Sequence, residues 1–303
     1  MDKKNVITSF VKNRPESLGA YGYGSGVFRQ SGYGIKDDPQ IDLIFLVEDL
    51  KDWHLENMRV NKDDYSLLGK LYVNVSSLKR LKGRNRITYY SQIYENGYRF
   101  KYGVMEEEDF LSFLDSWDNF FIAGRFQKPV LQIKGTEKEE EAIKKNKRQA
   151  LLVAALMSPA KLSKVDFYKI LCSLSYNGTL RMYVAENPHK VDNIVTGSYD
   201  RLNELYDLDV DFIKELDNDM IEIDHMMAIR HIKELPIGLL KYLYENNCDF
   251  LNIISIREGI NNYLSIHNKI EEINQTIDSI KTNGIVRSAP YLLAKVKKRV
   301  MGK

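Results

Sequence analysis

Residues 20–47 read AYGYGSGVFRQSGYGIKDDPQIDLIFLV, and this stretch decides the fold. It is rich in glycine and tyrosine at first and then leads into the apolar run Ile41–Val47. Pro39 precedes that run and an acidic cluster follows it, and a short apolar run with such flanks predicts a buried strand. A glycine-rich turn followed by a buried strand is therefore the first feature that we expect.

The glycine-rich turn and the strand after it carry residues suited to a nucleoside triphosphate. Gly24, Ser25 and Gly26 would bring backbone amides and a hydroxyl against phosphate oxygens. Sixteen residues after Gly26, Asp42 could hold Mg²⁺ beside that triphosphate. The spacing is similar to the nucleotidyltransferase (polymerase-beta-like) pattern, except that Ile44 stands where its second carboxylate is expected. An ordinary tight turn is the alternative.

Two other phosphate-binding folds are disfavoured. No Lys-Ser/Thr pair follows the glycines, as a Walker-type NTPase requires. No GxGxxG motif opens a helix, as a dinucleotide-binding fold requires.

Outward from this stretch, the pattern predicts an α/β fold. Tyr98–Met105 predicts a second strand, and residues 50–82 and 112–121 predict helices. The densely charged residues 134–148 predict a solvated helix face or a linker at a domain boundary, and residues 200–282 predict mostly amphipathic helix. Three units are expected: a nucleotidyltransferase domain over 1–135, a helical, winged-helix-like domain over 145–240, and a C-terminal helical region over 241–303 with a basic amphipathic tail.

Composition limits the partners. The 303 residues include 44 basic and 42 acidic ones, so overall charge gives no argument for nucleic-acid binding. Cys172 and Cys248 lie in apolar surroundings, which indicates thiols in a reducing compartment. The longest apolar run, residues 150–157, is far shorter than the roughly twenty residues of a membrane span. The N-terminal MDKKNVITSF has no secretory or transit pattern, so we expect a cytoplasmic, bacterial-type protein at the inner face of the cell membrane.

Several segments together resemble the Tam41/Mmp37 family, the mitochondrial-type phosphatidate cytidylyltransferases and their bacterial relatives. The resemblance covers residues from about Tyr21 to Val195, and the order of the segments makes it more specific than any one motif. The segments are YGYGSGVFRQ (21–30), PQIDLIFLV (39–47), WHLENMRVN (53–61), KYGVM (101–105), IAGRFQKPV (122–130) and LSYNGTLRMYVAENPHKVDNIV (174–195).

The resemblance implies that CTP and phosphatidate react, with Mg²⁺, to give CDP-diacylglycerol and pyrophosphate. Asp42 would bind the metal, Ser25 would contact the CTP phosphates, and Lys101 would offset charge at the α-phosphate. Further nucleotide- or phosphate-binding residues implied are Gly24, Gly26, His54, Asn57, Tyr65, Ser66, Arg125, Lys128, Arg181, Glu186, Asn187 and Lys190. Alternatively, His54 and Tyr65 are core residues, and the last four residues belong to a domain interface.

Two departures from the family pattern bear on the chemistry. Asp64 stands where the family has His before Tyr65-Ser66, and Thr179 stands where it has Asp. Two alternatives therefore stay open: a nucleotidyltransferase with a different acceptor, or a non-catalytic nucleotide-binding protein. No covalent nucleophile is required, because the phosphate of phosphatidate is itself nucleophilic and catalysis reduces to positioning and charge neutralisation.

The C-terminal segment predicts contact with an anionic membrane surface. No carboxylate follows Asp278, whereas seven basic residues do, and apolar residues recur among them at helical spacing. A basic amphipathic helix of this kind suits an anionic bilayer surface. The alternatives are a helix packed on the body or a disordered tail. The residues expected at the membrane are Lys295, Lys297, Lys298 and Arg299.

Overall fold

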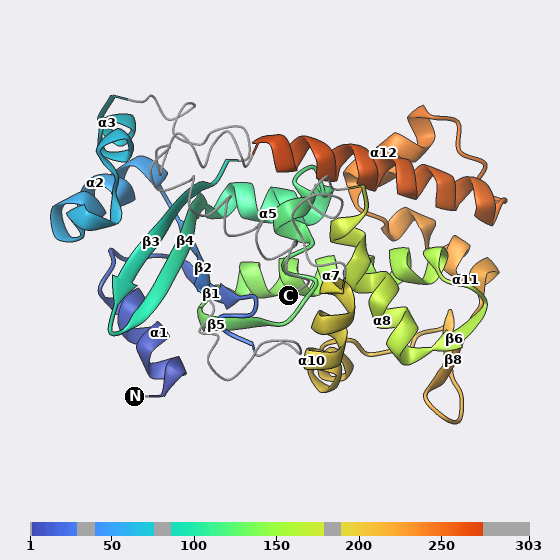
Figure 1. Ribbon diagram of the computed structural model, residues 1–303. Helices are drawn as coiled ribbons and strands as arrows, with labels where there is room; N and C mark the ends of the chain where they lie inside the picture. Colours follow the sequence, from blue (N-terminus) through green and yellow to red (C-terminus); the bar gives the residue numbers. More distant parts are fainter. Residues whose placement is uncertain (1, 29–39, 76–85, 179–188, 275–303) are drawn as a thin grey trace.

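The computed structural model describes residues 2–28, 40–75, 86–178 and 189–274 (Figure 1). Its first half alternates strands with helices around one sheet. The elements are α1 (Lys3–Lys12), β1 (Gly19–Tyr23), β2 (Ile41–Val47), α2 (Leu50–Val60), the 3₁₀ turn η1 (Lys62–Asp64), α3 (Leu67–Val75), β3 (Thr88–Glu95), β4 (Tyr98–Glu106), α5 (Glu107–Ser116), α6 (Phe120–Ala123) and β5 (Val130–Lys134).

The sheet has five strands in the order β3-β4-β2-β1-β5. β2 lies parallel to β4, and the other neighbours are antiparallel. Across the sheet, Asp42 is the register partner of Tyr23 on β1 and of Lys101 on β4. β2 buries all its residues except Asp42, which is half-buried at the start of the strand. An apolar central strand thus presents one carboxylate beside a lysine.

Side chains that alternate along β2 enter two different cores. Leu43 and Phe45 pack with residues of α1 and α2, including Phe10 and Trp53. Ile44 and Leu46 pack on the opposite face with residues of α5, including Phe110. Because Asp42 shares the parity of Ile44, its side chain lies on the α5 face of the sheet.

The second half is mainly helical and carries a small antiparallel sheet in the order β6-β8-β7. Figure 1 shows this helical half beside the larger sheet. Its elements are α7 (Glu137–Met157), β6 (Lys161–Ser163), α8 (Lys164–Ser173), η2 (Leu174–Tyr176), α10 (Lys190–Leu205), β7 (Ile213–Glu215), β8 (Met220–Ile223), α11 (His225–Arg230), η3 (Ile232–Glu234), α12 (Ile237–Glu245) and a helix over 253–274.

The second half has its own core, which also takes in residues from the first half. Leu151 on α7, Phe167 on α8 and Leu239 on α12 belong to it, together with Trp117 and Phe120 from around α6. The end of α5 is marked by Trp117, whose positive φ of 61° breaks the helix before α6 begins. The α6 segment therefore lies where the two halves meet.

Several expectations are confirmed. The mixed α/β class holds, β2 has the predicted bounds, and β4 extends the predicted strand by one residue. The charged run forms the first turns of α7, which Thr136 and Glu139 begin with a capping box. One expectation is wrong in part: residues 200–282 include β7 and β8, whose three and four residues are too short to show a clear period of two. In the described ranges, no helix is long and apolar enough to cross a bilayer.

Candidate active site

The glycine turn after β1 folds back onto the start of β2. Gly24 has φ of +75°, which favours glycine, and a side chain added there would meet Oδ2 of Asp42 at 3.6 Å. The carbonyl of Gly24 accepts hydrogen bonds from the N–H groups of Val27 and Phe28. A Cβ on Gly26 would lie only 2.1 Å from the carbonyl oxygen of Gln40. The turn therefore lies directly against Asp42, as the sequence predicted.

Arg125 lies between two aromatic rings on the same face of the sheet. Its guanidinium carbon is 4.1 Å from the ring centre of Tyr23 and 3.9 Å from that of Phe121. Its buried Nη1 has no hydrogen-bond partner among the described residues. Burial opposes the charge, but Tyr23, Tyr89 and Asp42 act against it and raise the pKa of Arg125. The structure thus places a fixed positive charge near Asp42, and one N–H donor group of that charge has no hydrogen-bond partner among the described residues.

Lys128 adds a second cation next to Arg125. Its Nζ donates to the carbonyl of Gly124 at 2.6 Å and to Oγ of Ser175 at 2.7 Å. Burial, together with the positive charges of Arg125 and Lys190, lowers the pKa of Lys128 to about 8. Repulsion among these cations means that a bound anion would relieve an existing electrostatic cost.

Lys190 and Lys101 bring positive charge from two other elements. Lys190 is the first residue of α10, where the helix dipole adds to its charge. Lys101 lies next to Asp42 on β4, with its Nζ 4.6 Å from the ring centre of Tyr89. The Arg201 side chain of α10 reaches Phe28 beside the glycine turn, 5.2 Å from the ring centre. Both halves of the chain thus contribute to one cationic site around Asp42.

His54, Asn57 and Tyr65 do not join this site, which corrects the expected placement. All three are buried on the α1–α2 face of the sheet, opposite Asp42. Nδ1 of His54 lies 2.8 Å from the hydroxyl of Tyr65, and Nε2 lies 2.8 Å from Oγ1 of Thr88. Burial lowers the pKa of His54 to about 3, so its ring is neutral. The sequence could not show this, because the pattern does not tell which face of the sheet α2 covers.

The hydrogen bonds of this buried network have a direction. The Asn57 amide donates to both the Tyr65 and Tyr102 hydroxyls, at 3.0 and 2.9 Å. Tyr102 donates onward to Oδ2 of Asp64 at 2.9 Å, and the Tyr65 hydroxyl is left to donate to His54. His54 then donates from Nε2 to Oγ1 of Thr88, and the Thr88 hydroxyl donates to the carbonyl of Val104 at 3.3 Å. The network therefore satisfies buried polar groups and supports β4 from behind.

Ser66 also has a structural contact. Its Oγ accepts a hydrogen bond from the N–H of Gly69 at 2.9 Å, at the start of α3. That is the geometry of a helix N-cap, a role that serine often fills. The structure therefore gives Ser66 a role in beginning α3.

Comparison with known proteins now decides the family. The family model described as "Phosphatidate cytidylyltransferase, mitochondrial" (Tam41/Mmp37) matches residues 4–298. The chain belongs to the Tam41/Mmp37 family. Proteins named phosphatidate cytidylyltransferase, mitochondrial, include relatives from Schizosaccharomyces pombe (34% identical over 94% of this chain and 80% of the relative), Dictyostelium discoideum (34%; 66% and 52%) and Homo sapiens (37%; 66% and 45%).

The comparison corrects the expected location of the protein and shows how much of two relatives it matches. The Tam41/Mmp37 relatives are named as mitochondrial enzymes, so the expected place at the inner face of a bacterial cell membrane is wrong. That expectation rested on the first residues alone, which carry too little information about location. The matches to the slime-mould and human relatives span about half of those proteins.

The departure at Asp64 from the Tam41/Mmp37 pattern has a structural counterpart. Asp64 is buried and accepts hydrogen bonds from Arg14, with a closest distance of 3.1 Å, and from Tyr102. Burial raises the pKa of Asp64, while the positive charge of Arg14 opposes that shift. Asp64 therefore belongs to the buried network. The second departure, Thr179, lies outside the described residues.

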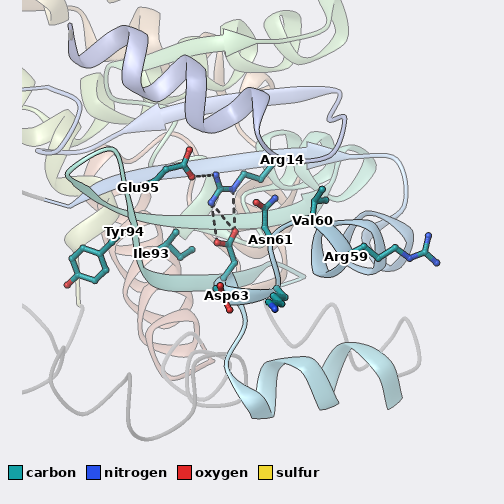
Figure 2. A pocket seen from close by; sticks show the side chains of 10 residues that line it. Arg14, Arg59, Val60, Asn61, Asp63, Ile93, Tyr94 and Glu95 are labelled. Atoms are coloured by element: carbon teal, nitrogen blue, oxygen red, sulfur yellow. Dashed lines mark hydrogen bonds and ion pairs between the residues drawn. The ribbon is translucent and has the colours of Figure 1, made fainter.

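A cavity of about 340 Å³ opens beside this ion pair, away from Asp42 (Figure 2). Figure 2 shows Arg14 reaching toward Glu95, and Arg14 forms ion pairs with both Asp64 and Glu95. The cavity lies between η1 and the end of β3, and neither Asp42 nor Lys101 lines it. Because Arg14 is already paired on both sides, it is not available to bind a phosphate in this cavity.

Some site residues were not anticipated, and some lie outside the described ranges. Tyr23, Phe121 and Ser175 hold Arg125 and Lys128 in place. Alternation along β1 could have identified Tyr23, since it is the register partner of Asp42. Nothing in the local pattern pointed to the other two. The sequence-predicted residues outside the described ranges are Arg181, Glu186, Asn187, Lys295, Lys297, Lys298 and Arg299.

Proposed function

We propose that this chain transfers the cytidylyl group of CTP to phosphatidate and gives CDP-diacylglycerol and pyrophosphate. One observation carries the proposal for this member of the family: a glycine turn, Asp42 and the cations Arg125, Lys128 and Lys190 gather on one face of the sheet. Such a concentration of positive charge around a single carboxylate suits a triphosphate better than a neutral ligand.

The proposed fold and domains follow from the same arrangement. Residues 1–135 form the nucleotidyltransferase (polymerase-beta-like) domain, with the glycine turn leading to the strand of Asp42. Residues 145–240 form the winged-helix-like domain, supported by the antiparallel β6-β8-β7 sheet and the helices around it. Residues 241–303 form the C-terminal region. α7 connects the first two units, because it packs against both α5 and α8.

Mg²⁺ fits this site only with help from the substrate. Ile44 is buried at the position of a second carboxylate, and the described residues hold no cluster of three or more metal-ligating side chains. Asp42 would hold the ion, with CTP phosphate oxygens and water completing the oxygen ligands that Mg²⁺ prefers. When bound, the ion would neutralise phosphate charge.

The reaction itself requires little chemistry from side chains. A phosphate oxygen of phosphatidate attacks the α-phosphorus of CTP, forming a new P–O bond, while the bond from that phosphorus to the β-phosphate oxygen breaks and pyrophosphate leaves. Amides of residues 24–26 and the Ser25 hydroxyl would hold the triphosphate. Lys101 and Arg125 would offset the charge that grows on the transferred and leaving phosphates.

Access to the lipid is proposed to come from the C-terminal segment. Seven basic residues and no acidic ones follow Asp278, so this segment carries net positive charge. Both phosphatidate and the membranes that contain it are anionic, and basic residues near such a surface favour binding. The chain would then act as a peripheral protein at a phosphatidate-containing surface.

An assay with radiolabelled CTP, Mg²⁺ and phosphatidate vesicles tests the proposal. Asp42→Asn keeps the size of the side chain but removes its charge, so we expect lipid-linked label to fall at least about a hundredfold. Asp52→Asn, which changes an exposed aspartate of α2, is the matched control and should retain activity.

The same assay separates the alternatives. Label that enters another acceptor, with none in the lipid, would support a different nucleotidyltransferase. Binding of CTP without turnover would support a non-catalytic protein. Full activity of Asp42→Asn would remove the proposed role of this carboxylate.

A further inference from the structure

The helix over residues 253–274 contacts both segments that hold the proposed cationic site. Figure 1 shows this helix running along the top of the molecule, from the helical half toward α5. Its residues Asn261, Asn268 and Glu271 follow one another at helical spacing, and their hydrogen-bond partners lie between residues 119 and 178. Asn268 and Glu271 are buried, whereas Asn261 is exposed. The helix therefore connects parts of the chain that are distant in sequence.

Glu271 is held by the start of α6. One carboxylate oxygen accepts a hydrogen bond from the N–H of Phe120, and the other accepts one from the N–H of Phe121. The side chain of Asn119 accepts from the next N–H, that of Ile122. Glu271 and Asn119 together satisfy the first three N–H groups of this short helix, which have no partner within the helix.

The position of Glu271 is constrained by its burial. Only 4% of the residue is exposed. Burial raises the pKa of Glu271, while the two N–H donors favour the carboxylate that accepts them and so oppose that shift. A buried carboxyl group is costly unless its oxygens are hydrogen-bonded, so the two donors hold it in one place. The backbone of Phe120 and Phe121 is fixed in return.

Phe121 passes this constraint to the active site. Its ring lies 3.9 Å from the guanidinium carbon of Arg125, which stands four residues along the chain. Arg125 carries the buried Nη1 that has no hydrogen-bond partner among the described residues. A shift of the Phe121 backbone would move the ring against which this guanidinium rests.

The same helix fixes the segment that holds Lys128. The Asn268 amide donates to the carbonyls of Leu174 and Asn177, at 3.1 and 2.9 Å. Between them, Ser175 accepts the hydrogen bond from Lys128. A Cβ on Gly124 would lie 2.5 Å from Cβ of Ser175, so the two segments touch at the backbone of Gly124.

We propose that Glu271 is a positioning residue for the reaction: it fixes Phe121, and through it the orientation of Arg125 toward the CTP or phosphatidate phosphate. The inference rests on the proposed function, because it assumes that Arg125 binds phosphate there.

A double-mutant cycle tests this inference, with kcat/KM for CTP measured on phosphatidate vesicles. Glu271→Gln keeps the shape but turns one acceptor into a donor that faces an N–H group, and we expect a loss of about tenfold. Arg125→Ala should lose about a hundredfold. The double variant should be no worse than Arg125→Ala, because the first change then has nothing left to orient. Glu258→Gln, at an exposed position of the same helix, is the control and should be silent.

A second variant protects the test against misfolding. Phe121→Leu keeps an apolar side chain and both bonds to Glu271, but it removes the ring beside Arg125. It should therefore reproduce the tenfold loss in a protein that still unfolds cooperatively, well above the assay temperature. Losses of Glu271→Gln and Arg125→Ala that multiply, or a fully active Phe121→Leu, would overturn the inference and leave the proposed function standing. A fully active Arg125→Ala would overturn the proposed role of Arg125 and the inference with it.

Discussion

Lys128 combines two hydrogen bonds to protein oxygens with two neighbouring positive charges. With a pKa of about 8, it is mostly charged at neutral pH and loses that charge just above it. We expect the dissociation constant for CTP to rise by about tenfold between pH 7.5 and 9.5, the range expected for loss of one charged hydrogen bond. Bound phosphate will move the midpoint above 8, because an anion favours the protonated amine. Isothermal titration calorimetry across this range measures the effect.

Two variants, and the opposite pH dependence of stability, separate the loss of CTP affinity from unfolding. Lys128→Arg should remain charged, so its CTP affinity should depend little on pH. Lys128→Met should bind CTP weakly at every pH. The unfolded chain, with the usual lysine pKa of 10.5, binds the extra proton between about pH 8 and 10.5. This group therefore makes stability rise with pH while CTP affinity falls. An equally steep pH dependence in Lys128→Met would show that another group titrates.

The glycine turn shows how one missing side chain allows two elements to meet. A Cβ on Gly26 would lie 2.1 Å from the Gln40 carbonyl oxygen, and backbone has to move to make room. Gly26→Ala should therefore displace the turn from Asp42 and lower CTP affinity about tenfold or more, with a loss of about 1–3 kcal/mol in the free energy of unfolding. Calorimetry and urea unfolding report the two effects separately.

The hairpin between β3 and β4 offers the matched control. Gly97 has φ of +80° and open space around its Cα, so Gly97→Ala adds backbone strain without a clash. It should lower stability by a similar amount while CTP affinity stays unchanged. Equal loss of affinity in both variants would mean that general destabilisation, not the displaced turn, weakens binding.

Elements with a strong local pattern were predictable from the sequence. The face of the sheet on which a helix packs was not. The bounds of β2 followed from an apolar run, interrupted only by Asp42, between Pro39 and acidic residues. The helix over His54 and Asn57 was also expected, but whether it covers the face of Asp42 depends on how the chain crosses the sheet. A few apolar residues pack equally well on either face. His54 therefore looked like a site residue and proved to be part of a neutral buried network.

At the scale of the whole molecule, the site depends on contacts between distant segments. Lys128 meets Ser175, and Glu271 meets Phe120 and Phe121, across 47 and about 150 positions of sequence. No local pattern encodes such pairs, since one side is an ordinary polar side chain and the other is a serine hydroxyl or a backbone N–H group. The glycine turn and the strand after it pointed to Asp42, whereas Lys101, Arg125 and Lys128 were expected only from the resemblance to the Tam41/Mmp37 family.

The strongest prediction about the whole molecule concerns its meeting with the lipid. If the basic C-terminal segment brings the enzyme to phosphatidate, replacing Lys295, Lys297, Lys298 and Arg299 by Gln should weaken binding to anionic vesicles by up to about a thousandfold at low salt, at about 1 kcal/mol for each charge. CTP affinity without vesicles should not change, because the proposal assigns these four residues to the lipid surface and not to the nucleotide. Vesicle sedimentation measures the first quantity, and a chain truncated after Gly284 should behave alike. Undiminished binding by both variants would place membrane contact elsewhere on the protein.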